Sequence, residues 1–265
     1  MQSTDKELMP AFFISHSGPN LALSEDSYGD YLRNFSKTIK KPNAIVIFSA
    51  HHEESVQTIG LIEKYPTIYD FYGFPQEYYE MTYTPKGDQA LAREISEIFT
   101  KQGIKNQFDK KRGLDHGAWT VLKLMYPNEE IPVVSLSVNP GLAPSELYKI
   151  GTALQPLREK GVLVIGSGAL SHNFSKFKFG AGFDCKPEQW AKDFIQWIDK
   201  CLKEWKTEDL FDYKKTPNGK VAAPTPEHFI PLFYAMGAGA NKKKVSMLHD
   251  SYYAATGSYS VWKFD

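Results

Sequence analysis

The sequence has little cysteine and no excess of charge of either sign. Only two of its 265 residues are cysteine, Cys185 and Cys201, too few for the disulfide framework of a small secreted protein. Lys+Arg and Asp+Glu both number 31, so the formal net charge is zero. A neutral chain offers no basic surface to replace the counterions of a nucleic acid or to bind an anionic membrane. We therefore expect neither as a partner.

Long hydrophobic runs and internal repeats are also absent. No apolar run approaches the ~20 residues of a membrane-spanning helix. Residues 1–7 (MQSTDKE) are polar, unlike the apolar core of a signal peptide, so we expect a cytoplasmic protein. No shift in composition marks a boundary, and apolar residues make up 42% of the chain. We therefore expect residues 1–265 to form a single domain with a large core.

Short apolar runs alternate with helical patterns along the chain. Four of these runs read as buried strands, at residues 10–14, 44–49, 132–138 and 162–165. Residues 258–264 alternate between polar and apolar positions and could form a closing strand. Strands that alternate with helices are typical of an α/β fold. We expect a mostly parallel central sheet flanked by helices on both faces.

Three apolar stripes at helical spacing predict the longer helices. They run from Leu91 to Phe99, from Leu147 to Leu157 and from Trp190 to Trp205. Gly103 and Gly161 follow the first two stripes as stop signals, and Ser145 is a plausible N-cap of the second. Residues 216–226 are rich in Pro, Gly and Ala, which predicts a loop over the sheet edge.

Histidines follow three of the predicted strands. His16 follows the first run, His51 and His52 follow the second, and His172 comes shortly after the fourth. Ligands of open α/β sheets bind outside the carboxyl ends of the strands, so these imidazoles should lie at one edge. A single histidine is more often structural. Three together favour a metal site, because imidazole is the commonest protein metal ligand.

A fourth candidate, His228, lies in the segment 224–228 (PTPEH). Thr225 can be the N-cap of a helix with Pro226 at its first position. Glu227 and His228 would then lie in the first turn, pointing about 100° apart, so both are not expected to bind one ion. Glu227 is a rival ligand, and its alternative role is to complement the helix dipole.

The other histidines have less distinctive surroundings. His116 follows Asp115, a good N-cap for a helix with an apolar face, and it lies either near the site or in a locally packed first turn. His51 and His52 face opposite sides of an extended segment, so only one should be a ligand. His52 is expected behind the site or exposed, and His249 is expected to be structural.

Six ordered motifs resemble those of the class III extradiol ring-cleavage dioxygenases, with the 4,5-DOPA dioxygenase type as the nearest branch. The resemblance runs from about Met9 to the C-terminus. The motifs lie at residues 14–19 (ISHSGP), 49–53 (SAHHE), 68–75 (IYDFYGFP), 114–119 (LDHGAW), 166–173 (GSGALSHN) and 224–228 (PTPEH).

The resemblance implies a role for each site residue. The metal ligands of the branch fall on His16, His51 and His228. Its acid/base residue falls on His172, which some descriptions also place in the metal shell as a fourth ligand, and His116 lies close to the substrate. This chain departs from the branch at His52, where a tryptophan is common. The better-known enzymes of the wider class use a glutamate as third ligand, where this chain has His228.

The implied reaction is insertion of both atoms of dioxygen into a DOPA-like catechol beside its diol, at one divalent metal ion. Fe(II) would support turnover, and Zn(II) would bind such a site without redox chemistry. A homo-oligomer is left open. Two rival functions are a zinc hydrolase with His172 or Glu227 as the base, and a non-catalytic metal-binding protein of the same fold. The aromatic segment 65–83 forms either a wall for a flat ring or a packed surface loop.

Overall fold

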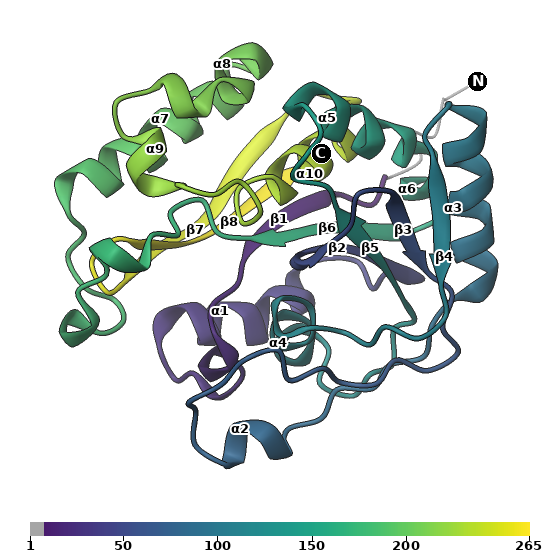
Figure 1. Ribbon diagram of the computed structural model, residues 1–265, viewed down its shortest axis with the longest axis horizontal. Helices are drawn as coiled ribbons and strands as arrows, with labels where there is room; N and C mark the ends of the chain where they lie inside the picture. Colours follow the sequence, from purple (N-terminus) through teal and green to yellow (C-terminus); the bar gives the residue numbers. More distant parts are fainter. Residues whose placement is uncertain (1–7) are drawn as a thin grey trace.

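The computed structural model describes residues 8–265, so the polar N-terminal residues 1–7 lie outside it. Its centre is one eight-stranded sheet in the order β4-β3-β5-β2-β6-β1-β8-β7 (Figure 1). The strands are β1 (Ala11–Ser15), β2 (Ala44–Glu53), β3 (Gln57–Gly60), β4 (Asn106–Asp109), β5 (Val133–Val138), β6 (Val162–Gly168), β7 (Val245–Tyr253) and β8 (Gly257–Phe264).

The four apolar runs form the middle of this sheet, as predicted. They are β1, β2, β5 and β6, which are adjacent in the order β5-β2-β6-β1 and pair in parallel. The predicted closing strand is β8, which pairs antiparallel with β1. The structure adds β3, β4 and β7, which the apolar pattern did not predict because β3 and β4 are only four residues long and β7 is largely polar. The sheet is therefore mostly parallel, with antiparallel pairs toward its edges.

Helices cover both faces of the sheet, as expected (Figure 1). They are α1 (Ser27–Phe35), α2 (Glu77–Glu80), α3 (Gln89–Lys101), α4 (His116–Met125), α5 (Pro144–Ala153), α6 (Gln155–Arg158), α7 (Gln189–Lys203), α8 (Thr207–Phe211), α9 (Gly219–Ala222) and α10 (Pro231–Ala238). Short 3-10 turns are η1 (Pro19–Leu23), η2 (Ser36–Thr38), η3 (Phe174–Lys176), η4 (Phe179–Ala181) and η5 (Tyr213–Lys215). Within residues 8–265, no helix combines the length and apolar character needed to cross a membrane.

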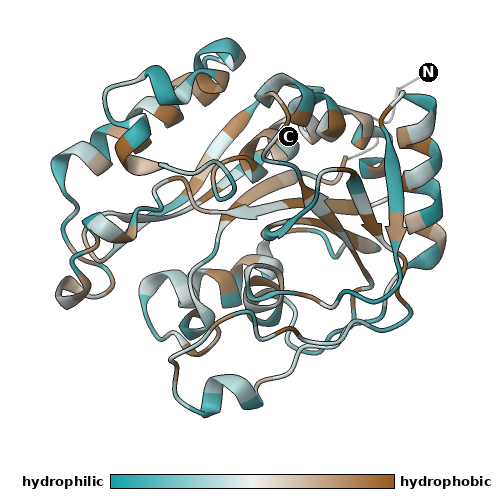
Figure 2. Ribbon diagram, viewed as in Figure 1, coloured by the Kyte–Doolittle hydropathy of each residue, from teal (hydrophilic) through white to brown (hydrophobic). Residues whose placement is uncertain are grey.

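Alternation along the strands divides the core into two layers. Phe12 and Ile14 of β1 pack with residues of α1 and α4, whereas Phe13 packs on the opposite face with residues of α3, α5, α7 and α10. Successive side chains of a strand point to opposite faces, so one apolar strand serves both layers. Figure 2 shows the result as hydrophobic central strands between two layers of helices that carry both hydrophobic and hydrophilic residues.

The structure corrects two details of the predicted helices. The stripe from Leu147 to Leu157 is split into α5 and α6, because Pro156 cannot continue the helical hydrogen bonding. The N-cap of α5 is Ala143, with Pro144 at the first position, rather than Ser145. The stripes from Leu91 and from Trp190 are single helices, α3 and α7, as predicted.

The predicted loop at residues 216–226 contains the short helix α9. Its carbonyl groups bind the segment that follows β6. The N–H of His172 donates to the carbonyl of Ala222 at 2.7 Å, and the Asn173 side chain donates to the carbonyl of Val221 at 2.7 Å. Helix α9 therefore holds His172 in place.

A buried arginine joins the ends of three segments far from the histidines. Arg158 is 1% exposed. Its guanidinium donates to the carbonyl of Met9 at 2.5 Å, to the carbonyl of Ala238 at 2.9 Å and to the side-chain oxygen of Asn241 at 3.1 Å. Removing this donor would leave two buried carbonyls without a partner.

We expect Arg158→Met to lower the free energy of unfolding by about 3–5 kcal/mol, because the buried acceptors lose their partners. Urea unfolding followed by circular dichroism measures the change. Arg93→Met is the control, since Arg93 is exposed on α3 and a surface substitution changes stability by only ~0.5 kcal/mol. Equal stability of the two variants would contradict this role of Arg158.

Candidate active site and metal centre

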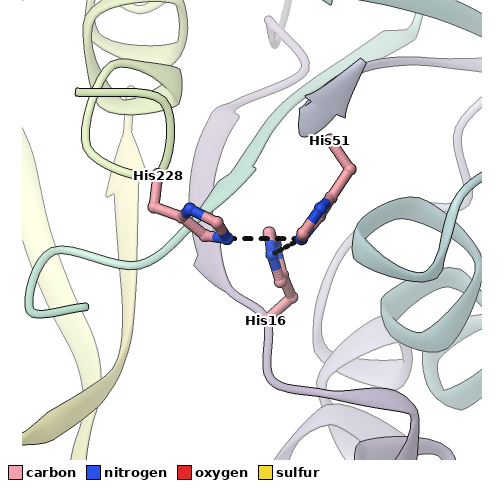
Figure 3. A group of neighbouring side chains, drawn as sticks. All are labelled: His16, His51 and His228. Atoms are coloured by element: carbon pink, nitrogen blue, oxygen red, sulfur yellow. Dashed lines mark hydrogen bonds between the residues drawn. The ribbon is translucent and has the colours of Figure 1, made fainter. Parts of the chain in front are cut away.

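Three of the predicted histidines converge at the carboxyl edge of the sheet (Figure 3). His16 directly follows β1, His51 lies near the end of β2, and His228 lies in the turn before α10. The Nε2 atoms of His16 and His51 are 3.1 Å apart, and those of His51 and His228 are 3.2 Å apart. Candidate ligand atoms of all three residues lie within 4.8 Å of one another.

The end of β6 holds two of these histidines by their backbones. The N–H of His16 donates to the carbonyl of Gly168 at 2.8 Å, and the N–H of Ala169 donates to the carbonyl of His228 at 2.8 Å. A Cβ on Gly168 would lie 2.2 Å from that His228 carbonyl oxygen. Only glycine therefore permits the chain around His228 to approach β6 this closely.

The structure corrects the predicted helix start near His228. Helix α10 begins at Pro231 with Ile230 as its N-cap, so Thr225 is not the cap of this helix. The carbonyl of His228 is bound to Ala169 instead of joining the helical ladder. Residues 226–230 form a separate turn, in which Phe229 and Ile230 donate to the carbonyl of Pro226.

Polar partners orient two of the imidazoles. Ser167 donates to the carbonyl of Gly117 at 2.5 Å, so its oxygen is free to accept the Nδ1–H of His16 at 2.9 Å. Glu227 lies behind His228, where Oε1 accepts Nδ1–H at 3.0 Å. In both rings the proton on Nδ1 leaves the Nε2 lone pair available for the centre of the cluster. Glu227 thus supports His228 as a hydrogen-bond partner.

Burial keeps the imidazoles neutral, which is the form that binds metal ions. Removal from water lowers the pKa of His16 well below its usual value, and neighbouring imidazoles lower it further. Burial lowers the pKa of His51 to about 3, with His116 contributing. It lowers the pKa of His228 to about 4, although the hydrogen bond to Glu227 opposes the shift.

The arrangement fits one divalent metal ion. Ligand nitrogens ~2.1 Å from an ion and 90–109° apart lie roughly 3.0–3.4 Å from one another. The two Nε2 separations of 3.1 and 3.2 Å fall within that range. Three neutral imidazoles with open space beside them form the donor set of a catalytic rather than a structural site.

His172 lies beside the cluster rather than within it. Its ring stacks on His228 with the centroids 3.7 Å apart and the planes 13° apart. It shares a group of closely spaced ligand atoms with Glu227 and His228, and not with His16 or His51. Burial lowers the pKa of His172 to about 4. The neighbouring Ser171 and Asn173 side chains do not hydrogen-bond the ring, and Asn173 instead donates to the carbonyl of Val221 in the chain around it.

Asp70 is the site residue that the sequence reasoning missed. Its Oδ1 accepts both the backbone N–H and the ring Nδ1–H of His116 at 2.9 Å, and Oδ2 lies 3.7 Å from Nδ1 of His51. Burial would raise the pKa of Asp70, but the hydrogen bonds from His116 outweigh it and hold the pKa at about 2. Its position in the motif at residues 68–75 was the sequence signal that could have identified it as a site residue.

His116 lies beside the histidine cluster, where its ring faces the cavity. It begins α4, and Asp115 is the N-cap as predicted. Its ring centroid lies 4.0 Å from that of His51. Because Asp70 accepts the proton on Nδ1, the Nε2 atom of His116 is left as an acceptor. His116 also lines the cavity beside the cluster.

The two other histidines lie outside the cluster. His52 points to the opposite side of β2 from His51, is 1% exposed and lies 3.2 Å from the Ser135 hydroxyl. It is therefore buried behind the site rather than exposed. His249 contacts Ser251 at 2.9 Å and packs against the rings of Tyr28 and Tyr31, which agrees with a structural role.

A cavity of about 730 Å³ opens beside the histidines. His16, His51, His116, His172 and His228 all line it. The aromatic segment 65–83 proves to serve two purposes: Phe71, Phe74 and Tyr78 line the cavity, whereas Tyr65 and Tyr83 are buried in the core. A flat aromatic molecule would therefore lie against aromatic walls with one edge at the histidines.

Gly117 lets α4 pack closely against the histidine cluster. A Cβ at this position would lie 2.6 Å from the Ser49 hydroxyl, 2.9 Å from Cε1 of His16 and 3.0 Å from Cδ2 of His51. The absence of a side chain lets the first turn of α4 pack directly under two of the imidazoles. Any larger residue must displace them.

The fold and site together define a metal-dependent α/β enzyme with an aromatic binding cavity. The family model described as the catalytic LigB subunit of aromatic ring-opening dioxygenase matches residues 10–262, and the chain belongs to this family. It is an extradiol dioxygenase, which opens the ring of a catechol with dioxygen. The resemblance in its motifs is thereby confirmed, and neither the hydrolase nor the non-catalytic alternative is favoured.

Individual relatives agree over nearly the whole chain. The chain is 39% identical to a 4,5-DOPA dioxygenase extradiol of Beta vulgaris, with 98% of each chain covered. It is 33% identical to a protein of the same name from Escherichia coli K12, with 90% of this chain and 88% of the relative covered. The crystal structure of an uncharacterized Escherichia coli K12 protein, 28% identical, superposes with a TM-score of 0.82 and covers 97% of this chain and 100% of the other.

We expect Gly117→Ala to weaken zinc affinity by about 10–100-fold, the usual effect of disturbing the residues that support metal ligands. The added methyl group must displace Ser49, His16 or His51. Competition with a chromogenic chelator measures the affinity. Gly180→Ala is the matched control, because a Cβ there meets nothing within 4 Å. Unchanged affinity in Gly117→Ala would show that the imidazoles do not bind the ion as a group.

Proposed function

We propose that this enzyme cleaves the ring of a DOPA-like catechol at one Fe(II) ion held by His16, His51 and His228. The observation that carries the proposal is the convergence of these three imidazoles at the wall of an aromatic cavity. In the rings of His16 and His228, the Nδ1 proton is held by Ser167 and Glu227, so that Nε2 is free to bind the ion. The names of the relatives from Beta vulgaris and Escherichia coli support the choice of a DOPA-like substrate.

The choice of iron rests on the chemistry of the reaction. Bound Fe(II) would supply open positions for the diol and for dioxygen, together with the electrons that zinc cannot supply. The same three imidazoles would also bind Zn(II) well, since zinc stands above iron in the usual affinity order. A zinc-loaded sample would then be folded and inactive.

His172 serves as the acid/base in this proposal. At neutral pH a pKa of about 4 leaves the imidazole uncharged, so it can accept a proton from a catechol hydroxyl and later return it. Its stacking on His228 places it beside the ligands, and its distance from the ligand atoms of His16 and His51 favours this role over that of a fourth ligand. The hydrogen bond from its backbone N–H to Ala222 fixes its position.

His116 acts as a second polar contact for the substrate. Asp70 holds its Nδ1 proton, which leaves Nε2 able to accept a hydrogen bond within the cavity. The Asp70 carboxylate, which is bonded to Nδ1, would also stabilise positive charge on this ring during the reaction. We therefore assign His116 a catalytic role together with His172.

The remaining features of the proposal concern the whole chain. We propose that residues 1–265 act as one catalytic domain, which is supported by a single sheet and by a family match over residues 10–262. We propose a cytoplasmic enzyme, and zero net charge supports the absence of nucleic-acid or anionic membrane partners. Its expected partners are an aromatic diol and dioxygen, and self-association is left to measurement.

Oxygen uptake with the purified protein tests the function. We expect the sample loaded anaerobically with Fe(II) to consume about one dioxygen per 4-alkylcatechol and to form a yellow ring-opened product, because both oxygen atoms enter the ring. The zinc-loaded sample should bind catechol without consuming oxygen. Oxygen-independent hydrolysis by the zinc form would contradict the proposal and support a hydrolase.

Variants of the histidines test the separate roles. We expect His172→Gln to lower kcat by about 10²–10⁴-fold, the usual contribution of acid/base catalysis, while most of the metal stays bound. His16→Ala should lose metal and activity together, and His249→Gln should keep both, since His249 lies outside the cavity lining. Metal analysis beside kinetics measures both. If His172→Gln loses metal as completely as His16→Ala, then His172 is a ligand.

A further inference from the structure

The catalytic cavity has an unusual balance of charge. Nine aromatic side chains line it, and among the described residues of its lining there is no lysine or arginine. The one carboxylate in the lining is Asp70, whose oxygens already face His116 and His51. A second carboxylate, Glu227, lies behind His228. The fixed charge in the lining is therefore a single carboxylate, which lies at the histidine end of the cavity.

The aromatic walls lie where the substituent of a catechol would project. The diol edge of the ring belongs at the histidines, so a chain on the far side of the ring reaches away from them. The cavity of about 730 Å³ is far larger than a single ring, and its lining includes Phe74, Phe177 and Tyr253. These three side chains are half-buried. A substituent of two or three carbons would be partly removed from water there.

We propose that this cavity selects its catechol by the charge of the substituent: it accepts neutral and cationic side chains and disfavours a carboxylate that no amine on the same side chain balances. The inference deepens the proposed function and rests on it, because it assumes that the diol binds at the three histidines.

Each part of this selectivity follows from the groups that line the cavity. A carboxylate placed among aromatic rings loses part of its hydration and finds no cation in the lining to replace it. An ammonium group in the same place gains attraction from the faces of the aromatic rings. A neutral alkyl chain gains the burial of its apolar surface. A zwitterionic amino acid combines a favourable and an unfavourable group and should fall between the extremes.

Binding to the zinc-loaded enzyme tests the preference without turnover. Four catechols that share the 3,4-dihydroxyphenyl ring serve as probes: 4-ethylcatechol, 3,4-dihydroxyphenylethylamine, 3,4-dihydroxyphenylalanine and 3-(3,4-dihydroxyphenyl)propanoate. Anaerobic calorimetry at neutral pH gives each Kd. We expect the propanoate to bind at least about tenfold more weakly than the ethyl and ethylamine compounds, with the zwitterion between them.

A variant that adds a cation should reduce the preference against the carboxylate. Phe179 lines the outer part of the cavity near Phe177 and Tyr253, and it is 57% exposed, so an arginine placed there would stay hydrated and charged. We expect Phe179→Arg to strengthen binding of the propanoate relative to 4-ethylcatechol by about 3–10-fold. Phe179→Leu is the matched control, since it removes the ring without adding charge. We expect this variant not to strengthen binding of the propanoate relative to 4-ethylcatechol.

The outcomes separate this inference from the proposed function. Oxygen uptake by the Fe(II) enzyme with all four catechols, together with equal Kd values for the propanoate and 4-ethylcatechol, overturns the charge preference and leaves the function intact. An unchanged affinity ratio in Phe179→Arg likewise overturns it. If none of the four binds or is consumed, then the proposed function fails and the preference fails with it.

Discussion

The active site depends on hydrogen bonds made at the carboxyl end of β6. This one strand end accepts the backbone N–H of His16 at Gly168, donates to the carbonyl of His228 from Ala169, and contacts the His16 ring through Ser167. Two imidazoles that are more than 200 residues apart in the chain are thereby held at fixed positions, and β2, the neighbour of β6, brings His51 to them. Because these contacts are mainly to backbone atoms of the sheet, they hold the histidines in fixed positions relative to it.

The same packing determines the chemistry of the imidazoles. Helices α4 and α10 cover opposite faces of the sheet and meet its edge on either side of the cluster. Gly117 lets α4 approach His16 and His51, and Gly168 of β6 lets the chain around His228 and the start of α10 approach the sheet. This close packing removes the histidines from water and so keeps the rings neutral, as metal binding requires. Burial, orientation by Ser167 and Glu227, and the short distances between Nε2 atoms are therefore consequences of one arrangement.

Aromatic and charged residues have separate places around this centre. Carboxylates stand behind the imidazoles, where Asp70 and Glu227 accept Nδ1 protons, and the aromatic side chains form the walls away from them. The carboxylates increase the basicity of the rings that they bind. The aromatic walls exclude water from a flat substrate and leave its substituent without a cation to meet. In the proposed mode of binding, the histidines orient the diol and the aromatic walls select the substituent.

The sequence alone determined the central four strands and the edge where His16, His51 and His172 lie, because apolar runs and the direction of parallel strands leave a local pattern. It also predicted the start of α4 at Asp115. It did not reveal β3, β4 and β7, which are short or polar and become strands by pairing with neighbours.

Only the tertiary structure decided how the side chains of the site support one another. Asp70 meets His116 across 46 residues of sequence, and Ser167 meets His16 across 151. It also decided that Glu227 supports His228 and that the turn before α10 is not part of the helix. Contacts between residues so distant in the chain leave no periodic signal in the sequence, because they arise only when the strands and helices have packed.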